Sequence, residues 1–313
     1  MPRALITGVL GQDGSYLAEL LLKKQYTVIG TVRKGSKAAS QLLDRVTIVE
    51  DDSLDQARLL QLVKEHQPDE VYNLAAQSSP MESFKDPVAT GELNGLGVVR
   101  LLEAIREACP RARLFQASSS EIFGNTLANP QTEATVLAPR SPYGIAKAYA
   151  HWMVQEYRQR HHLYACSGIL YNHESPRRSP AFVTRKITQG VARIKKGEAG
   201  ELRLGNLEAV RDWGFAGDYV RAMWLALRSD HPGDYIIATG KTHTVREFCE
   251  TAFACAGLDY RAYVVPDADP PRPPETAILV GDPAKAEREL GWQREVDFKG
   301  LVRLMIDADL HRS

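Results

Sequence analysis

The chain has 313 residues, 44% of them hydrophobic, and its 39 basic and 39 acidic residues give a formal net charge of zero. Such a chain can bury a full core, and its neutral balance excludes a global field that would favour nucleic acid or an anionic membrane. No apolar run approaches the roughly 20 residues of a membrane-spanning helix. The four cysteines show no CxxC spacing, so neither structural disulfides nor a metal site is expected. We therefore expect a globular cytoplasmic protein without nucleic-acid or membrane partners.

Short apolar runs alternate with amphipathic segments over the first half of the chain, as in parallel sheets flanked by helices. The predicted strands are residues 4–7, 27–32, 46–50, 70–75, 113–118 and 163–170. The predicted helices are residues 15–24, 55–66, 96–108 and 142–161. This series predicts an α/β protein with a Rossmann-type, doubly wound parallel sheet.

The pattern becomes irregular after Tyr171, where arginine, proline and glycine are scattered among aromatic residues. Helices are predicted at residues 183–196, 217–228 and 244–256, followed by a proline-rich loop at 266–274. We expect residues 1–171 to form the cofactor-binding Rossmann domain. Residues 172–313 should form mainly a smaller substrate-binding lobe over the open edge of the sheet, with some segments returning to the Rossmann domain.

Three glycines, Gly8, Gly11 and Gly14, lie between the first predicted strand and the first predicted helix. Glycine lets the backbone turn tightly and approach a pyrophosphate, which the free N–H groups and dipole of the helix N-terminus stabilise. The GxxGxxG spacing differs from GxGxxG, but the strand, turn and helix are the setting that a dinucleotide site requires. The sequence therefore predicts a dinucleotide cofactor at this turn.

The second predicted strand ends at Arg33 and Lys34 with no acidic residue at its tip. An acidic residue there would bind the ribose 2′-hydroxyl of NAD, whereas a basic residue suits the 2′-phosphate of NADP. NADP is therefore favoured. The alternative is a solvated basic turn, because Lys37 and Arg45 also lie nearby.

Two further strand ends are candidates for cofactor contact. Asp52 lies just beyond the third predicted strand, where a carboxylate or a neighbouring amide can contact adenine. Residues 73–78 end the fourth, and their small alanines leave room for the phosphates and nicotinamide ribose of the cofactor. Taken singly, each segment is equally typical of an ordinary loop.

Tyr143 and Lys147 lie four residues apart on a predicted helix. Residues at this spacing share a face, so the ammonium can lie near the phenol and lower its pKa. A phenolate near neutral pH accepts a proton from an alcohol. The spacing alone would favour an ordinary amphipathic helix with a surface Tyr and Lys, and the glycine turn upstream reverses that preference.

Ser119 and Glu121 close the fifth predicted strand. Residues two apart in an extended segment point the same way, so these two side chains should face one pocket. A hydroxyl beside a phenol can hydrogen-bond a reacting alcohol or carbonyl, and a carboxylate can remove a proton adjacent to a carbonyl. The alternative is a serine-rich loop in which Glu121 caps the following turn.

Together these features resemble the extended short-chain dehydrogenase/reductase family, and within it the GDP-mannose 4,6-dehydratases. The resemblance covers residue 4 to about residue 310, and its motifs are residues 11–17, 73–78, 170–178, 182–187, 204–206 and 211–219. The related dTDP-glucose dehydratases carry Asp between their active-site Thr and Glu, where this chain has Ser120. That difference favours the GDP-mannose type.

The resemblance implies an NADP-dependent hydro-lyase that converts GDP-D-mannose to GDP-4-keto-6-deoxy-D-mannose by internal hydride transfer and loss of water. It implies four catalytic residues: Ser119 beside the 4-oxygen of the sugar, Glu121 as the base at C5, and Tyr143 with Lys147 as the base at the 4-hydroxyl. A homodimer or homotetramer is also implied.

The resemblance also implies the binding residues. Those for the cofactor are Gly8, Gly11, Gln12, Asp13, Gly14, Arg33, Asp52, Ser53, Leu74, Ala75, Ala76, Gln77, Tyr143, Lys147, Leu170, Asn172, His173 and Arg178. Those for the substrate are Ser78, Ser83, Asn172, Glu174, Val183, Lys186, Leu204, Gly205, Asn206, Arg211, Arg272 and Glu275. In chemical terms, Lys186 and Arg211 can neutralise two phosphates, and Asn206 can hydrogen-bond a base edge.

Three segments depart from the family pattern. Ser119 stands where threonine is usual, which keeps the hydroxyl but removes the methyl group that restricts its rotamer. The stretch after Lys34 is shorter than in relatives, where it reaches a neighbouring subunit, so dimer and tetramer both remain open. Residues 79–82 differ beside the nicotinamide, which leaves another GDP-sugar such as a GDP-heptose open as substrate. The other alternative is a non-catalytic NADP- or nucleotide-sugar-binding protein on the same fold.

Overall fold

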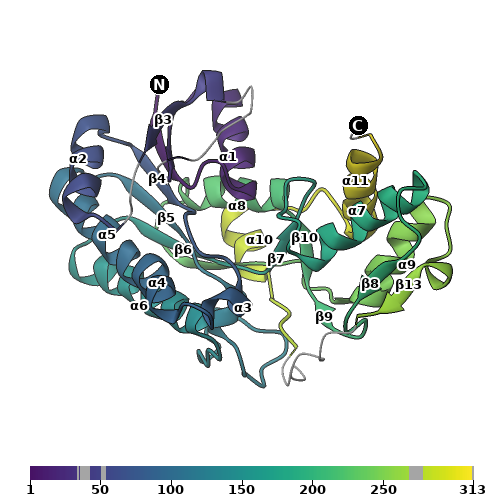
Figure 1. Cartoon of the computed structure of the whole chain (residues 1–313). Coiled ribbons are helices and arrows are strands. Elements are labelled where there is room, and N and C mark those ends of the chain that lie inside the picture. The colour runs from purple at the N-terminus through teal and green to yellow at the C-terminus, as the bar shows by residue number, and fades with distance from the viewer. Residues whose placement is uncertain (34, 36–42, 51–53, 268–277, 312–313) are drawn as a thin grey trace.

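The computed structural model describes residues 1–33, 35, 43–50, 54–267 and 278–311. Figure 1 shows a larger lobe built around a seven-stranded sheet and a smaller lobe beside it. The smaller lobe contains α7 (Val183–Lys195), α9 (Val245–Cys255) and α11 (Phe298–Leu310). Within the described ranges, no helix combines the length and the apolar character that crossing a bilayer demands.

The large sheet has the strand order β11-β6-β5-β4-β1-β2-β3, and every neighbouring pair is parallel. Its strands are β1 (Arg3–Thr7), β2 (Thr27–Val32), β3 (Thr47–Glu50), β4 (Glu70–Asn73), β5 (Arg113–Ala117), β6 (Ala165–Leu170) and β11 (Asp234–Ile237). The predicted doubly wound fold is confirmed. The strand order reverses between β1 and β4, and ligands of such sheets bind at the carboxyl ends of strands at this switch point.

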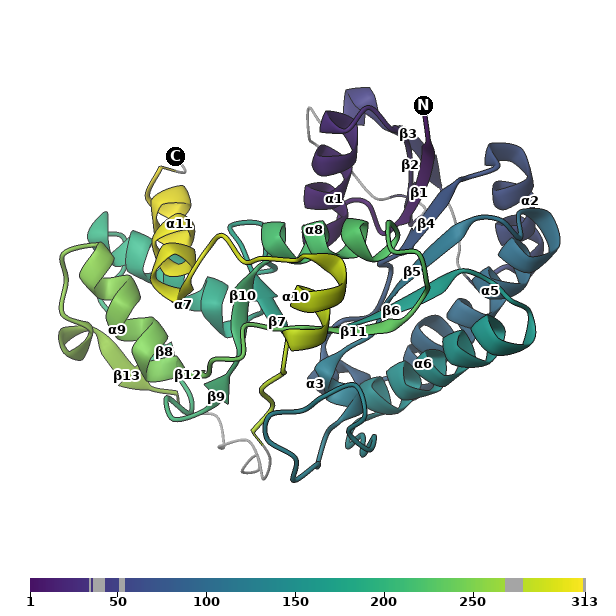
Figure 2. The same cartoon turned by 180° about the vertical axis from the view of Figure 1, so that it is seen from behind.

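Helices cover both faces of the sheet, which is why its strands are continuous apolar runs. One face packs against α1 (Gln12–Lys23), α8 (Ala216–Ala226) and α10 (Ala284–Leu290) in a single buried cluster. The other packs against α2 (Gln56–His66), α5 (Gly97–Ala108) and α6 (Pro142–Arg160). Figure 2 shows α8 and α10 lying between the two lobes.

Three elements beyond residue 171 pack in or on the large sheet. β11 pairs with β6, and α8 and α10 contribute Met223 and Ala286 to the same core as β1. The smaller lobe has its own core around Phe248, Trp213 and Met305. Its remaining helical turns and strand pairs are η4 (Tyr260–Ala262), β7 (Asn172–Glu174) with β10 (Trp213–Phe215), β9 (Val210–Arg211) with β12 (His243–Thr244), and β8 (Leu202–Leu204) with β13 (Val264–Pro266).

Several short elements were not predicted from the sequence. They are η1 (Leu43–Arg45), α3 (Pro80–Ser83), α4 (Pro87–Gly91), the π-helical turn η2 (Glu92–Leu96) and the 3-10 turn η3 (Ser120–Ile122). Each has too few residues to show a periodic apolar pattern, and such short helices depend on tertiary packing. α3 and α4 instead begin with side-chain caps from Ser79 and Asp86, each followed by proline.

Candidate functional site

The turn between β1 and α1 has no space for a side chain at Gly8 or Gly14. Gly8 has a φ of +70°, which favours glycine, and a Cβ on Gly14 would lie 2.4 Å from the Gly8 carbonyl oxygen. Gly11 is the N-cap of α1 and supplies no side-chain cap, so the first N–H groups of the helix are not covered by its own residues. These features fit the diphosphate of a dinucleotide.

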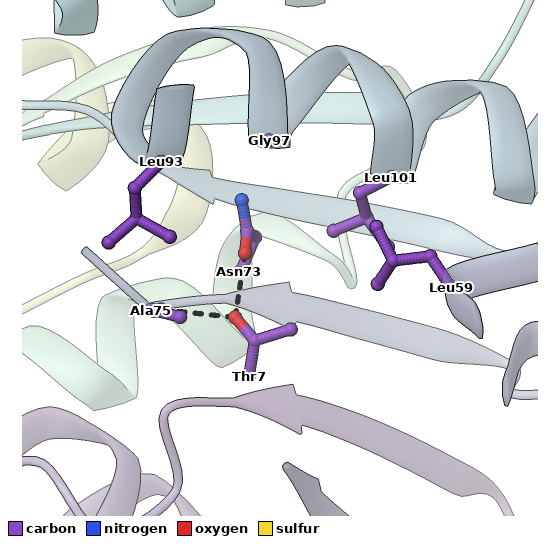
Figure 3. Close-up of a pocket in the computed structure, with 7 residues that line it drawn as sticks. All are labelled: Thr7, Leu59, Asn73, Ala75, Leu93, Gly97 and Leu101. Carbon is purple, nitrogen blue, oxygen red and sulfur yellow. Dashed lines mark hydrogen bonds between the residues drawn. The ribbon is translucent and has the colours of Figure 1, made fainter. Parts of the chain in front are cut away.

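A buried chain of hydrogen bonds ties together the carboxyl ends of β1, β4 and β5. The Thr7 hydroxyl donates to Asn73 Oδ1 at 2.6 Å and accepts from the backbone N–H of Ala75 at 3.0 Å. Asn73 Nδ2 donates to Gln116 Oε1 at 2.7 Å, and Gln116 Nε2 donates to the Ala117 carbonyl at 2.9 Å. Figure 3 shows the Thr7 hydroxyl bonded to both Asn73 and Ala75, and all three line a small cavity that α5 covers. Sequence reasoning did not single out Thr7, although a polar residue ending an apolar strand is a usable signal.

Asn94 holds the loop that follows β4. Its Oδ1 accepts from the Gln77 backbone N–H at 2.9 Å, and its Nδ2 donates to the Gln77 carbonyl at 2.8 Å. Asn94 is buried in the π-helical turn η2, and such turns are frequent at functional sites. The segment Leu74–Gln77, predicted to contact the cofactor, is therefore fixed from β1 at one end and from η2 at the other.

Tyr143 and Lys147 face the same interior from α6. The helix begins beside them because the Ser141 hydroxyl accepts the Gly144 N–H at 3.0 Å. Their side chains are buried, and Lys147 Nζ lies 5.9 Å from the centre of the Tyr143 ring. Lys147 donates at 2.8 Å to the same Ala117 carbonyl that ends the polar chain.

Burial has the largest effect on the pKa of both Tyr143 and Lys147. It raises the pKa of the Tyr143 phenol to about 12, against the lowering effect of its hydrogen bond with Ser119. It also lowers the pKa of Lys147 from 10.5 to about 8. Burial therefore leaves the pKa of the phenol well above neutral in the chain itself, and the predicted lowering of the Tyr143 pKa by Lys147 stays a prediction.

Ser119 and Glu121 reach the phenol by a different geometry from the predicted one. β5 ends at Ala117, and the Ser119 hydroxyl accepts the Glu121 N–H at 3.2 Å as the cap of η3. The prediction of an extended segment is wrong, because this cap turns the chain. Both side chains nevertheless act on Tyr143: Ser119 hydrogen-bonds the phenol, and the Glu121 carboxylate raises its pKa.

Gly144 lets η3 pack against the first turn of α6. A Cβ at this position would lie 2.7 Å from the Glu121 carbonyl oxygen and 3.2 Å from Pro139 Cβ. Any larger residue would push the two backbones apart. The glycine within the run Ser-Pro-Tyr-Gly therefore brings Glu121 next to Tyr143 on the neighbouring element.

β7 connects the cofactor turn with the smaller lobe. His173 Nε2 lies 2.8 Å from Asp13 Oδ2, and Gln12 donates to the His173 carbonyl at 3.0 Å. Glu174 is buried, accepts from the Thr184 hydroxyl at 2.6 Å and pairs with Arg178 at 3.3 Å. Asn172 is half-buried at the start of the same strand, which follows the buried Leu170.

The predicted substrate residues of the smaller lobe lie on several elements. Val183 begins α7 at the surface, and Lys186 on the same helix pairs with Asp267 at 3.2 Å. Asn206 accepts the Glu208 N–H at 2.9 Å, which makes it part of a local turn. Arg211 donates to the Val210 carbonyl at 2.7 Å.

The remaining predicted residues divide into buried, exposed and undescribed positions. Leu204 is a core residue of the smaller lobe, and Ser83 is buried with its hydroxyl donating to the Pro80 carbonyl. Arg33, Ser78 and Gly205 are exposed, and Ala76 is half-buried. Asp52, Ser53, Arg272 and Glu275 lie outside the described residues, as do Lys34 and most of the proline-rich loop.

Asp212 anchors the strand that carries Arg211. Its carboxylate accepts from the N–H and hydroxyl of Thr239, at 2.8 and 2.6 Å, and from the Gly240 N–H at 3.0 Å. These acceptor contacts link the smaller lobe to the loop that follows β11. Sequence reasoning placed Asp212 in a motif without a role, because its partners lie more than 25 residues away.

The doubly wound sheet, the glycine turn and the buried Tyr143 and Lys147 pair define an extended short-chain dehydrogenase/reductase. Solved structures of this shape include the UDP-glucose 4-epimerase of Thermus thermophilus in complex with NAD, at 30% identity and a TM-score of 0.87 over 99% of this chain and 100% of that one. The UDP-glucose 4-epimerase of Thermotoga maritima gives 26% identity and a TM-score of 0.88, covering 98% of each chain.

Sequence comparison identifies the family within the extended short-chain dehydrogenase/reductases. A family model described as GDP-mannose 4,6 dehydratase matches residues 5–305. GDP-mannose 4,6 dehydratase 2 of Arabidopsis thaliana is 47% identical over 98% of this chain and 86% of that protein. GDP-mannose 4,6-dehydratase of Yersinia enterocolitica is 42% identical over 100% of this chain and 95% of that protein. The chain belongs to the GDP-mannose 4,6 dehydratase family, as the sequence motifs predicted.

The buried ammonium of Lys147 should lower the free energy of unfolding of the protein. Burial lowers the pKa of Lys147 from 10.5 to about 8, which corresponds to ~3 kcal/mol of destabilisation of the folded state. The hydrogen bond from Lys147 to the Ala117 carbonyl stabilises the fold by ~1 kcal/mol, so that removing the ammonium gains the difference. We expect Lys147→Met to raise the free energy of unfolding by ~2 kcal/mol near pH 7 while abolishing turnover. Urea unfolding of both proteins measures the difference.

The pH dependence of that difference has a fixed sign. Between about pH 8 and about pH 10 the unfolded wild-type chain binds more protons at Lys147 than the folded one, so wild-type stability rises with pH. The stability advantage of Lys147→Met should therefore shrink across this window. An advantage that stays constant, or a variant less stable than wild type at pH 7, would contradict the buried cation.

Proposed function

We propose that this protein converts GDP-D-mannose to GDP-4-keto-6-deoxy-D-mannose and water, with NADP as a tightly held redox cofactor. Family membership supports the substrate and the reaction. The observation that carries the proposal is the convergence on one buried phenol of a hydroxyl, a carboxylate and an ammonium, from Ser119, Glu121 and Lys147. These are the groups needed for oxidation of an alcohol followed by elimination.

The chain's residues fit the cofactor at three places. The glycine turn and the N-terminus of α1 would hold the diphosphate, the segment Leu74–Gln77 would border the nicotinamide half, and Arg33 at the end of β2 would meet the 2′-phosphate. When bound, NADP would accept the hydride from C4 of the sugar and would later give it to C6. The positive charge of its oxidised nicotinamide ring would also lower the pKa of a neighbouring phenol.

The chain's own groups move the protons. Tyr143 takes the proton of the sugar 4-hydroxyl as the C4–H bond is oxidised, and Ser119 holds the 4-oxygen by a hydrogen bond. Lys147 stabilises the resulting phenolate by its charge. The new 4-ketone acidifies C5, so Glu121 removes the C5 proton and passes a proton to the departing 6-hydroxyl, which leaves as water. C5 would then take a proton from solvent as C6 is reduced, and Tyr143 would release its proton, so that the sequence is redox-neutral and the side chains return to their starting states.

The test is a direct assay. The purified chain, given GDP-mannose and substoichiometric NADP, should form a product one water lighter whose NMR spectrum shows a 4-keto group and a C6 methyl group. Product formed in D₂O should carry deuterium at C5, because solvent supplies that proton. No product from GDP-mannose, or product only from another GDP-sugar, would overturn the proposed substrate.

We also propose that the protein is a homodimer joined through α6. Its outer face carries an apolar stripe at helical spacing: Ile145, Tyr149 and Trp152 are 57%, 39% and 54% exposed. Val88 and Leu96, on the adjacent α4 and η2, are also exposed. A second copy of the same face would cover this stripe by two-fold symmetry.

Trp152→Glu should therefore convert the protein to a monomer. A charge within a self-complementary apolar interface is desolvated twice by symmetry, which disfavours association strongly. Sedimentation velocity measures the change. Leu127→Glu is the matched control, because Leu127 is 95% exposed and lies outside this stripe. An unchanged sedimentation coefficient for Trp152→Glu, or a monomeric wild type, would contradict this interface.

A further inference from the structure

His173 is buried between the cofactor turn and the smaller lobe, and both of its ring nitrogens meet acceptors. Nε2 lies 2.8 Å from Asp13 Oδ2, and Nδ1 lies 2.7 Å from the Tyr171 carbonyl oxygen. A carbonyl oxygen and an ionised carboxylate can only accept hydrogen bonds. Both nitrogens of His173 must therefore carry a proton to satisfy these contacts, which makes the ring an imidazolium.

The surroundings of the ring support that charge. The His173 ring stacks on Tyr219 of α8, with centroids 4.6 Å apart. Burial opposes the charged form, but Asp13 outweighs it and the pKa of His173 is raised; burial likewise opposes the Asp13 carboxylate, yet His173 lowers its pKa. Arg178 is the other charged group that acts on the pair, and it favours the carboxylate and disfavours the imidazolium.

The negative charge of Asp13 at the cofactor turn disfavours the binding of a second anion there, unless a nearby cation balances it. It is the second residue of α1 and lies in the first turn, where the helix N-terminus attracts anions. A carboxylate there uses part of that attraction and repels a second anion such as a diphosphate. The contact with His173 brings one positive charge against this negative one.

We propose that His173 is a permanent imidazolium whose charge cancels that of Asp13, and that this cancellation lets the N-terminus of α1 bind the diphosphate of a nicotinamide dinucleotide. His173 is thus a positioning residue for the cofactor site, and the proposal rests on the proposed function. Two neighbouring hydrogen bonds also hold the cofactor turn against β7. Gln12 donates to the His173 carbonyl at 3.0 Å and accepts from the Ser175 hydroxyl at 2.8 Å.

The first experiment reads the charge directly in the wild-type protein. Nitrogen-15 NMR of histidine-labelled protein should show one of the eight histidines with both nitrogens protonated from about pH 7.5 to about pH 8.5, where an ordinary histidine is mostly neutral. The signal is assigned by its loss in His173→Gln. A neutral, singly protonated His173 at pH 7.5 would overturn the proposal.

The second experiment tests the cancellation by cofactor affinity, measured by calorimetry without substrate. His173→Gln leaves Asp13 unneutralised and should weaken NADP binding about tenfold or more. Asp13→Asn/His173→Gln removes both charges and should bind at least about fivefold more tightly than His173→Gln alone. Equal affinity of the two variants would overturn the cancellation. A wild-type chain that binds no nicotinamide dinucleotide would contradict the proposed function itself, and the NMR experiment would still decide the charge of His173.

Discussion

Glu121→Gln should halt the reaction between oxidation and elimination, so that product formation falls about 10³-fold while the first hydride transfer still occurs. The amide keeps the size of the side chain and the Ser119 cap on η3, because that cap bonds the backbone N–H of residue 121. It cannot take the C5 proton. With enzyme in excess over GDP-mannose, the near-ultraviolet absorbance of the reduced cofactor should rise and persist.

Tyr143→Phe is the matched control for this partial reaction. Removing the phenol removes the base for the 4-hydroxyl, so neither reduced cofactor nor product should appear, although the buried ring is kept. The two variants therefore separate the two proton transfers. Wild-type turnover by Glu121→Gln, or accumulation of reduced cofactor by Tyr143→Phe, would contradict the roles proposed here.

The parts of the fold that follow from local pattern could be predicted from the sequence. The strand Thr27–Val32 has the predicted bounds, and α6 begins at the predicted Pro142. Both follow from signals within the segment: a continuous apolar run for a buried parallel strand, and a Ser-Pro start for a helix. The family motifs are equally local, which explains why the family was identified correctly.

The site's connections could not be predicted, because they join distant residues. The bond between His173 and Asp13 spans 160 positions, and that between Asn73 and Gln116 spans 43. The turn at Ser119 depends on one side-chain cap, the bond from the Glu121 N–H to the Ser119 hydroxyl. Local sequence does not decide between this turn and a longer β5, because serine suits both conformations. The pKa of Tyr143 depends on burial, which no spacing along the helix reveals.

One motif residue has an explanation in packing alone. Arg185 lies within the run 182–187 that resembles a substrate-binding motif, yet its side chain is 1% exposed and pairs with the buried Asp309 of α11. It also donates to the Thr188 hydroxyl at 3.0 Å. The pair ties α11 to α7, the helix that carries Lys186.

Arg185→Met should destabilise the protein by ~3–5 kcal/mol, because it leaves the Asp309 carboxylate buried without this cation. Arg185→Met/Asp309→Leu should recover most of that loss, since α7 and α11 both contribute to the apolar core of the smaller lobe and apolar side chains of similar volume suit it. Urea unfolding measures both. Arg203→Met is the control from the same lobe: its pair with Glu201 is 55% and 49% exposed, so its loss should change stability by less than ~1 kcal/mol. If the double variant is as unstable as Arg185→Met, the cost arises from lost packing of the arginine rather than from loss of its ion pair with Asp309.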